Sequence, residues 1–166
     1  GNVLLADGST ANCDLLLEGG EITRIAPNLQ ADTLIDAVGN HVLPGLIDLH
    51  THGIGFLSVA AGSMVEYAEI EASKGTTAFF PTLFAPPEEA AKQMQRHLRE
   101  TDNLRKTPQI AGFRLESPYL AHTGAGISRD LAPIAPETTR MLLNASGGHV
   151  KIWDISPELQ GTPDVI

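Results

Sequence analysis

The sequence predicts an α/β fold with a parallel sheet, preceded by a short segment made of β-strands alone. From residue 44 onward, apolar runs of strand length alternate with amphipathic runs of helix length. The connections between these runs are short, which is typical of parallel βαβ units. Before residue 44 the sequence contains only short apolar runs, which Asp-Gly, Gly-Gly and Pro interrupt.

The N-terminal segment is expected to form a small sheet or half of a β-sandwich. Its apolar runs read NVLLADG, CDLLLEGG, EITRIAP and DTLIDAVG. Glu18-Gly19-Gly20-Glu21 has the composition of a hairpin turn, because glycine accepts the positive φ that tight turns require. We therefore expect these four runs to be strands.

Three helices are predicted in the segment that follows. Apolar residues at helical spacing predict one over 62–75. Two prolines followed by acidic residues predict the start of a second over 86–103, with His97 on its surface. A third is predicted over 135–146, before two glycines. Strands are expected at 46–52, 76–83, 109–117 and 149–156, the first of them buried because its apolar run is continuous.

The position of the polar residues favours a barrel over an open sheet. No G-x-G-x-x-G follows the first strand of this segment, as it would in a dinucleotide-binding sheet. Polar side chains instead follow the first and third strands, and (β/α)₈ barrels carry their sites at such carboxyl ends. A barrel needs about 250 residues. Residues 44–166 are therefore expected to supply the first four β/α units only.

Composition excludes several classes of partner. The chain has 166 residues, 42% of them hydrophobic, and a net charge of -9. Nucleic acid and anionic membranes require a basic surface, so neither is expected as a partner. No run approaches the ~20 apolar residues of a membrane-spanning helix, and no signal peptide is visible. Cys13 is the only cysteine, which fits a reducing cytoplasm.

A candidate metal site follows the first apolar strand. Residues two apart on a strand share a face, so His50 and His52 point the same way, as does Asp48. Two neutral imidazoles side by side can hold a divalent ion. The alternative is a pair of polar residues that opens a loop.

Glu116 ends the third strand and is the candidate carboxylate ligand. In a barrel it would reach the same rim as His50 and His52. The alternative is an ion pair with Arg114, which shares its strand face. His122, in the Gly- and Ser-rich loop that follows, is a candidate substrate contact. Lys151 on the fourth strand is either a carbamylated bridging ligand or, more simply, a solvated charge.

Together these residues resemble the amidohydrolase superfamily and, within it, the N-acetylglucosamine-6-phosphate deacetylases. VLPGLIDLHTHG resembles the superfamily's first-strand metal motif. KGTTAFFPTL and KIWDISPEL are similar to the second-strand and fourth-strand segments of the deacetylases. GFRLESPYL is similar to their third-strand Leu-Glu-Gly-Pro motif. The resemblance extends over nearly the whole chain.

The resemblance implies a (β/α)₈ barrel and a β-sandwich built from both chain ends. Residues 1–43 would be the N-terminal part of the sandwich, and 44–166 the N-terminal half of the barrel. It further implies one or two divalent ions, zinc first, with iron, manganese or cobalt as alternatives. Glu116, His50 and His52 would be ligands, and the general-base aspartate would lie beyond Ile166. The expected protein is a cytoplasmic homodimer that removes the acetyl group from an N-acetyl amino sugar 6-phosphate.

The chain departs from the family pattern at three places. Ser117 stands where the family usually has Gly, Arg114 where it often has His, and Gly126 where it tends to have His. Alternatives therefore stay open. One is another amidohydrolase, resembling dihydroorotase or D-aminoacylase, which a modified Lys151 would favour. The other is a catalytically incomplete chain that serves as an interaction module.

Overall fold

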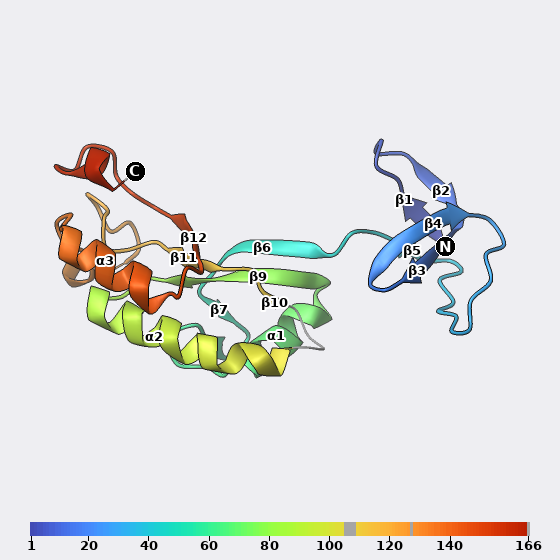
Figure 1. Cartoon of the computed structure of the whole chain (residues 1–166), viewed down its shortest axis with the longest axis horizontal. Coiled ribbons are helices and arrows are strands. Elements are labelled where there is room, and N and C mark those ends of the chain that lie inside the picture. Colours follow the sequence, from blue (N-terminus) through green and yellow to red (C-terminus); the bar gives the residue numbers. More distant parts are fainter. Residues whose placement is uncertain (105–108, 127, 166) are drawn as a thin grey trace. The chain divides into compact units, whose positions relative to one another are not determined.

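The computed structural model describes residues 1–104, 109–126 and 128–165, and the chain divides into two compact units, Gly1–Pro44 and Gly45–Ile166. The first unit consists of short strands (Figure 1): β1 (Asn2–Leu4), β2 (Thr10–Asn12), β3 (Asp14–Glu18), β4 (Glu21–Ala26) and β5 (His41–Val42). One sheet has the order β2-β1-β5, and β3 and β4 form a separate antiparallel hairpin. The predicted Gly19-Gly20 turn joins the hairpin, with both glycines at positive φ.

The prediction of a strand within DTLIDAVG is wrong. Residues 31–40 contain no strand, and three apolar side chains there are largely exposed: Leu34, Ile35 and Val38. The backbone bonds locally instead, because Asp36 Oδ1 accepts a hydrogen bond from the amide of Val38 at 2.9 Å. Such local bonding by an Asp side chain competes with a strand ladder.

The second unit alternates strands and helices, which confirms the α/β prediction. Its strands are β6 (Leu46–Thr51), β7 (Gly53–Ile54), β8 (Leu57–Ser58), β9 (Thr76–Leu83), β10 (Gln109–Ile110), β11 (Phe113–Leu115) and β12 (Val150–Trp153). Its helices are α1 (Met64–Ser73), α2 (Pro87–Glu100) and α3 (Pro136–Ala145), with 3-10 turns η1 (Thr101–Leu104), η2 (Ser128–Asp130) and η3 (Thr162–Asp164). All three predicted helices are present.

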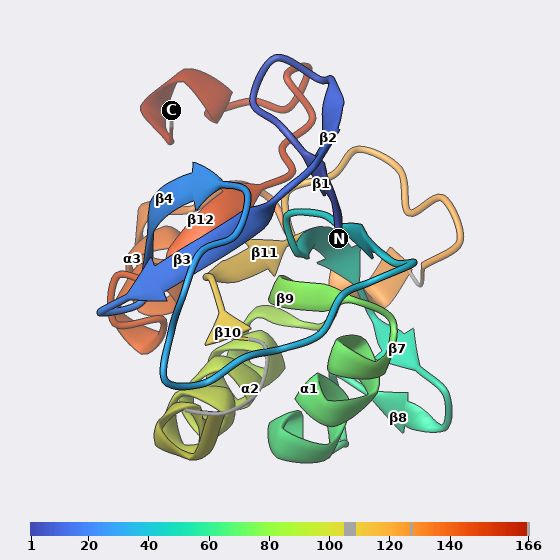
Figure 2. The same ribbon diagram turned by 90° about the vertical axis from the view of Figure 1, so that its right-hand side faces the viewer.

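The main sheet is parallel and follows chain order. β6 pairs with β9, β9 with β11, and β11 with β12. Strands of a doubly wound sheet reverse their order at a switch point, whereas those of a barrel run in sequence. Viewed from the end in Figure 2, the helices lie around the outer side of β9, β11 and β12. Over the described residues the sheet is open, so the structure has the order of a barrel without its closure.

Pro81 explains why the third predicted strand is split in two. The carbonyls of Phe79 and Leu83 both accept hydrogen bonds from the β10–β11 side, from Ala111 and Glu116 respectively. Alternation places the backbone nitrogen of Pro81 on this side too. Proline has no N–H to donate, so the ladder is interrupted at this point. The partner strand accordingly breaks between β10 and β11.

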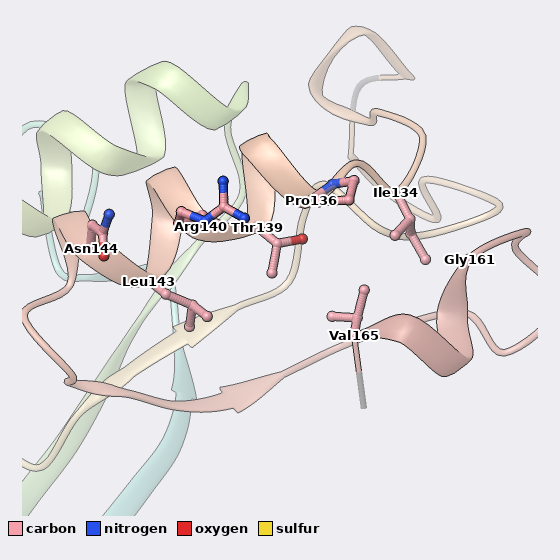
Figure 3. A pocket seen from close by; sticks show the side chains of 8 residues that line it. All are labelled: Ile134, Pro136, Thr139, Arg140, Leu143, Asn144, Gly161 and Val165. Atoms are coloured by element: carbon pink, nitrogen blue, oxygen red, sulfur yellow. The ribbon is translucent and has the colours of Figure 1, made fainter.

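The core lies between the sheet and its helices. Its largest fully buried side chains come from every layer: Met64, Tyr67, Phe79, Leu83, Met94, Phe113, Leu115 and Leu142. Each such side chain stabilises the fold by roughly 1.5–3 kcal/mol relative to exposure. No helix in the described part of the chain is long and apolar enough to span a membrane. A pocket of about 380 Å³ lies beside α3 and is lined by Arg140 and seven other residues (Figure 3).

β6 is far more exposed than its apolar run predicts. Leu46, Ile47 and Leu49 are 61%, 60% and 53% exposed, so the expected buried strand is not observed. The physical reason is that β6 has a strand neighbour, β9, on one edge only among the described residues.

His97 is buried, which corrects the prediction that it lies on the surface of its helix. Its side chain is fully inaccessible and packs against Phe113, with ring centroids 6.2 Å apart. Among the described residues, neither ring nitrogen has a hydrogen-bond partner. Burial lowers the pKa of His97 to about 4, and the neighbouring Arg96 charge adds to this effect.

The buried imidazole predicts a stability that decreases at mildly acidic pH. Because its folded pKa lies near 4 and its unfolded value near 6.5, the unfolded chain binds the extra proton between these values. The free energy of unfolding should therefore decrease by up to about 3 kcal/mol as the pH is lowered from about 6.5 to 4. Urea unfolding at several pH values measures this decrease.

A His97→Leu variant should lose that part of the pH dependence. The matched control is His149→Gln, which removes an exposed histidine and should retain the decrease that His97 causes. If His97→Leu kept the full wild-type dependence, the decrease would have to come from other groups.

Candidate metal centre

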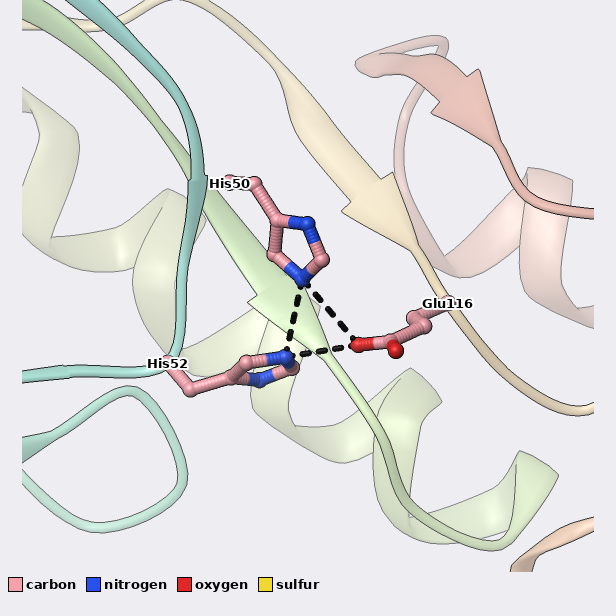
Figure 4. Close-up of side chains that lie close together, drawn as sticks. All are labelled: His50, His52 and Glu116. Carbon is pink, nitrogen blue, oxygen red and sulfur yellow. Dashed lines mark hydrogen bonds and ion pairs between the residues drawn. The ribbon is translucent and has the colours of Figure 1, made fainter. Parts of the chain in front are cut away.

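The three predicted ligands meet at the carboxyl ends of β6 and β11. His50 lies near the end of β6, His52 follows it, and Glu116 follows β11 (Figure 4). The two histidine Nε2 atoms are 3.1 Å apart. Glu116 Oε2 lies 3.2 Å from His50 Nε2 and 2.6 Å from His52 Nε2. Within the described ranges, no other group of three such side chains lies as close together.

The hydrogen-bond ladder between β6 and β9 is irregular at the end of β6, next to the two histidines. The register shifts between Asp48 and Thr51, and such bulges commonly redirect side chains beside functional sites. The amide of His50 donates to Asp48 Oδ1 at 3.0 Å. Asp48, predicted to share the histidines' face, thus binds backbone and takes no part in the cluster.

Thr51, between the two histidines, anchors the strand end. Its side chain is buried, and its hydroxyl forms a short hydrogen bond with the hydroxyl of Tyr67 on α1. Its amide donates to Thr82 Oγ1 on β9 at 3.1 Å. Sequence patterns do not single out Tyr67 or Thr82, because helical and strand spacing show which face a residue occupies but not which hydroxyl it reaches. The two contacts hold His50 and His52 on the opposite face.

Glu116 is held by the turn that follows β11. Its amide donates to the carbonyl of Leu83 at 3.0 Å and so extends the β9–β11 ladder by one bond. The fully buried Ser117 donates to the carbonyl of Ala85 at 2.8 Å and accepts from the amide of Ala85 at 3.0 Å. The serine that departs from the family pattern therefore joins this turn to the segment after β9.

The predicted alternative for Glu116, an ion pair with Arg114, does not form. Arg114 instead makes two bonds to Asp154, Nε to Oδ2 and Nη2 to Oδ1, each 2.8 Å long. Glu116 is thereby left to face the two histidines alone.

The donor set fits a divalent cation. Two imidazole nitrogens and a carboxylate oxygen converge, and these are the usual ligands of zinc and related ions. With metal–ligand distances of ~2.0–2.1 Å, ligands on a tetrahedron lie roughly 3.3 Å apart. Two of the three observed separations, 3.1 and 3.2 Å, are close to that spacing. The side chains of His50 and His52 are 42% and 48% exposed, so water can reach them.

The other predicted candidates lie outside this cluster. His122 is exposed in the loop after β11. Lys151 Nζ donates to the carbonyl of Gly148 at 3.1 Å, which turns it toward the amino end of β12. Gly126 packs against Phe84 so closely that a Cβ would lie 2.1 Å from Cζ of the ring. A histidine at Gly126 would therefore require the Phe84 side chain to move.

Comparison with known proteins confirms the resemblance seen in the sequence. No family model matches the chain. An N-acetylglucosamine-6-phosphate deacetylase of Haemophilus influenzae is 29% identical over 163 residues, which cover 92% of this chain and 42% of the relative. A dihydroorotase of a Thermoanaerobacter species is 44% identical over 54 residues, 31% of this chain and 12% of the relative. The chain thus spans less than half of the curated relatives it matches.

The comparison with solved structures shows that this chain shares its fold with part of a deacetylase structure. The crystal structure of N-acetyl-D-glucosamine-6-phosphate deacetylase from Mycobacterium smegmatis matches 99% of this chain and 44% of its own, with a TM-score of 0.77 and 24% identity. At that identity the match concerns the fold alone.

Ser117→Ala should destabilise the second unit. The substitution leaves the amide and carbonyl of the buried Ala85 without partners, which should cost about 2 kcal/mol of unfolding free energy. Urea unfolding at neutral pH measures the loss. Ser73→Ala, at an exposed position on α1, is the control and should change stability by less than about 0.5 kcal/mol. Equal stability of the two variants would contradict the role assigned to Ser117.

Proposed function

We propose that this chain is the N-terminal half of a metal-dependent deacetylase that hydrolyses the acetamide of an N-acetyl amino sugar 6-phosphate. The observation that supports this most directly is the convergence of His50, His52 and Glu116 at the carboxyl ends of parallel strands. In barrel enzymes this edge carries the site. The similarity to curated deacetylases over 92% of the chain supports the reaction class.

Zinc is the ion we propose first, with iron, manganese or cobalt as alternatives. A mixed imidazole and carboxylate set suits zinc, and all three groups bind in their deprotonated form. Such an ion would supply the Lewis acidity that activates a water molecule and polarises the acetyl carbonyl. Whether one or two ions bind would depend on ligands in addition to His50, His52 and Glu116.

The residues of this chain would hold and orient the reacting groups. His50 and His52 would bind through Nε2, and Glu116 through Oε2, the atoms that already face one another. Thr51 and Ser117 would fix the two strand ends on which these ligands sit. His122, on the exposed loop after Glu116, is proposed as a substrate contact.

Further parts of the proposal follow from the family resemblance. The general base would be an aspartate beyond Ile166. Residues 1–43 would contribute to a β-sandwich, and the barrel that begins at residue 44 would be completed by four more β/α units. The complete protein would be a cytoplasmic homodimer.

A dihydroorotase-like hydrolase is the second candidate, since a dihydroorotase is 44% identical to this chain over 54 residues. The two candidates differ in the role of Lys151. In the dihydroorotase-like candidate it would be a carbamylated bridging ligand. Its amine donates to Gly148, near the amino end of β12, whereas the ligands lie at the carboxyl ends of their strands. This geometry favours the deacetylase.

In the complete protein, Glu116→Gln should abolish both metal binding and hydrolysis. The amide keeps the shape of the side chain but loses the charge that a cation requires. Since the loss of a residue that merely supports a ligand reduces metal affinity by about 10–100-fold, we expect a reduction of at least about 100-fold here. Metal content by mass spectrometry and acetate release from N-acetylglucosamine 6-phosphate measure the two effects.

Glu69→Gln is the control for that variant, because Glu69 is an exposed carboxylate on α1. It should retain wild-type metal content and acetate release. Full activity and metal content in Glu116→Gln would refute the assignment of Glu116 as a ligand.

Lys151→Arg separates the two candidate reactions. Arginine keeps the positive charge and can still donate to Gly148, but it cannot be carbamylated. In a deacetylase of the proposed kind, metal content and acetate release should stay at the wild-type level. If Lys151→Arg instead lost a metal ion and also lost an activity on a cyclic amide that the wild type shows, the result would favour the dihydroorotase-like candidate.

A further inference from the structure

Arg114 on β11 bonds to Leu49 on β6 and to Asp154 just after β12, close to the candidate metal centre. It lies two residues before Glu116 on β11, and therefore on the same face. Two of its nitrogens bond to Asp154, which follows β12, at 2.8 Å each. A third, Nη1, donates to the carbonyl of Leu49 on β6 at 3.3 Å.

The contact with Leu49 falls where β6 is least regular. Leu49 and His50 lie within the register shift between Asp48 and Thr51, where the regular ladder with β9 is interrupted. The guanidinium therefore bonds to the residue immediately before a candidate ligand. Its other end is fixed by a bidentate pair whose side chains are 21% and 28% exposed. A planar guanidinium can make all three bonds at once, whereas a lysine amine cannot make the bidentate pair.

The charge of Arg114 would otherwise oppose a cation site. A guanidinium on the same face as Glu116 could pair with that carboxylate and compete with a metal ion for it. Asp154 neutralises the guanidinium and directs it away from Glu116, whose Oε2 faces the two histidines instead.

We infer that Arg114 is a positioning residue of the metal centre: it sets β6 relative to β11, and Asp154 holds it away from Glu116. This inference rests on the proposed metal-dependent function. Arg114 is not one of the three side chains that converge at the candidate metal centre. It acts through the backbone of Leu49 and so through the placement of His50. The resemblance to deacetylases leaves this arrangement open, because the family often has histidine at this position.

Cobalt binding to the complete protein, of which this chain is the proposed N-terminal half, tests the inference. Co²⁺ affinity is measured by competition with a chromophoric chelator, and the geometry of the ligands by the visible absorption spectrum of the bound ion. Arg114→Met should weaken Co²⁺ binding by about tenfold and alter the spectrum, because residues that orient metal ligands contribute about 10–100-fold. Arg140→Lys, at an exposed position on α3, is the control and should bind like the wild type.

Asp154 supplies a second and sharper test. In Asp154→Asn, the guanidinium loses the negative charge and one of the two acceptor oxygens that hold it. It can then pair with Glu116, so Co²⁺ binding should weaken by at least tenfold. Arg114→Met combined with Asp154→Asn removes the competing charge, so the double variant should bind no more weakly than Arg114→Met alone. Losses that multiply in the double variant would overturn the role given to Asp154. Wild-type affinity and spectrum in Arg114→Met would overturn the inference.

Two further measurements separate this inference from the proposed function. Urea unfolding in the presence of a chelator reports the stability of the metal-free variants. Reduced stability with unchanged cobalt affinity would make Arg114 purely structural and overturn the inference. If the wild type binds Co²⁺ and Glu116→Gln does not, the proposed metal site stands whatever Arg114 does. If the wild type binds no Co²⁺, the proposed function and the inference both fail.

Discussion

Parallel pairing with β9 is the constraint on which the second unit depends. β9 pairs with β6 on one edge and with β10 and β11 on the other, so it sets the register of both ligand-bearing strands. Parallel strands end at the same edge of a sheet, which brings His50, His52 and Glu116 together although 66 residues separate the first from the last. Without that register, the two motifs would have no reason to meet.

Short polar side chains then hold the strand ends against this central strand. Thr82 Oγ1 on β9 accepts a hydrogen bond from the amide of Thr51. The hydroxyl of Ser117 forms two hydrogen bonds with the backbone of Ala85, just beyond β9. Each of these side chains is buried, where an unpaired polar group would cost roughly 1–3 kcal/mol. Because the hydroxyls of Thr51, Thr82 and Ser117 are all paired, the same bonds that satisfy these buried groups also orient the ligands. Arg114 extends this pattern across β6, β11 and β12.

The candidate site was predictable because its signals are local. His50 and His52 follow an apolar run at a spacing of two, and Glu116 precedes a Ser-Pro that must end a strand. The expectation for His97 was wrong because it followed residue type and not helical position. His97 comes three residues after Met94 and seven after Ala90, on the buried face of α2, where the ring of Phe113 on β11 packs against it. The expectation for β6 was wrong as well, since its apolar composition predicts burial that the described chain does not provide.

By itself, the sequence determined the alternation of strands and helices, the three helices, the hairpin at Gly19-Gly20 and the identity of the candidate ligands. These follow from periodicity, turn chemistry and residue type, all of which act within a few neighbouring residues. Tertiary structure alone decided which partner each polar side chain takes. Arg114 pairs with Asp154 and not with Glu116, and Lys151 bonds to Gly148. The reason is physical: such choices depend on distances between strands, which packing sets and local sequence does not.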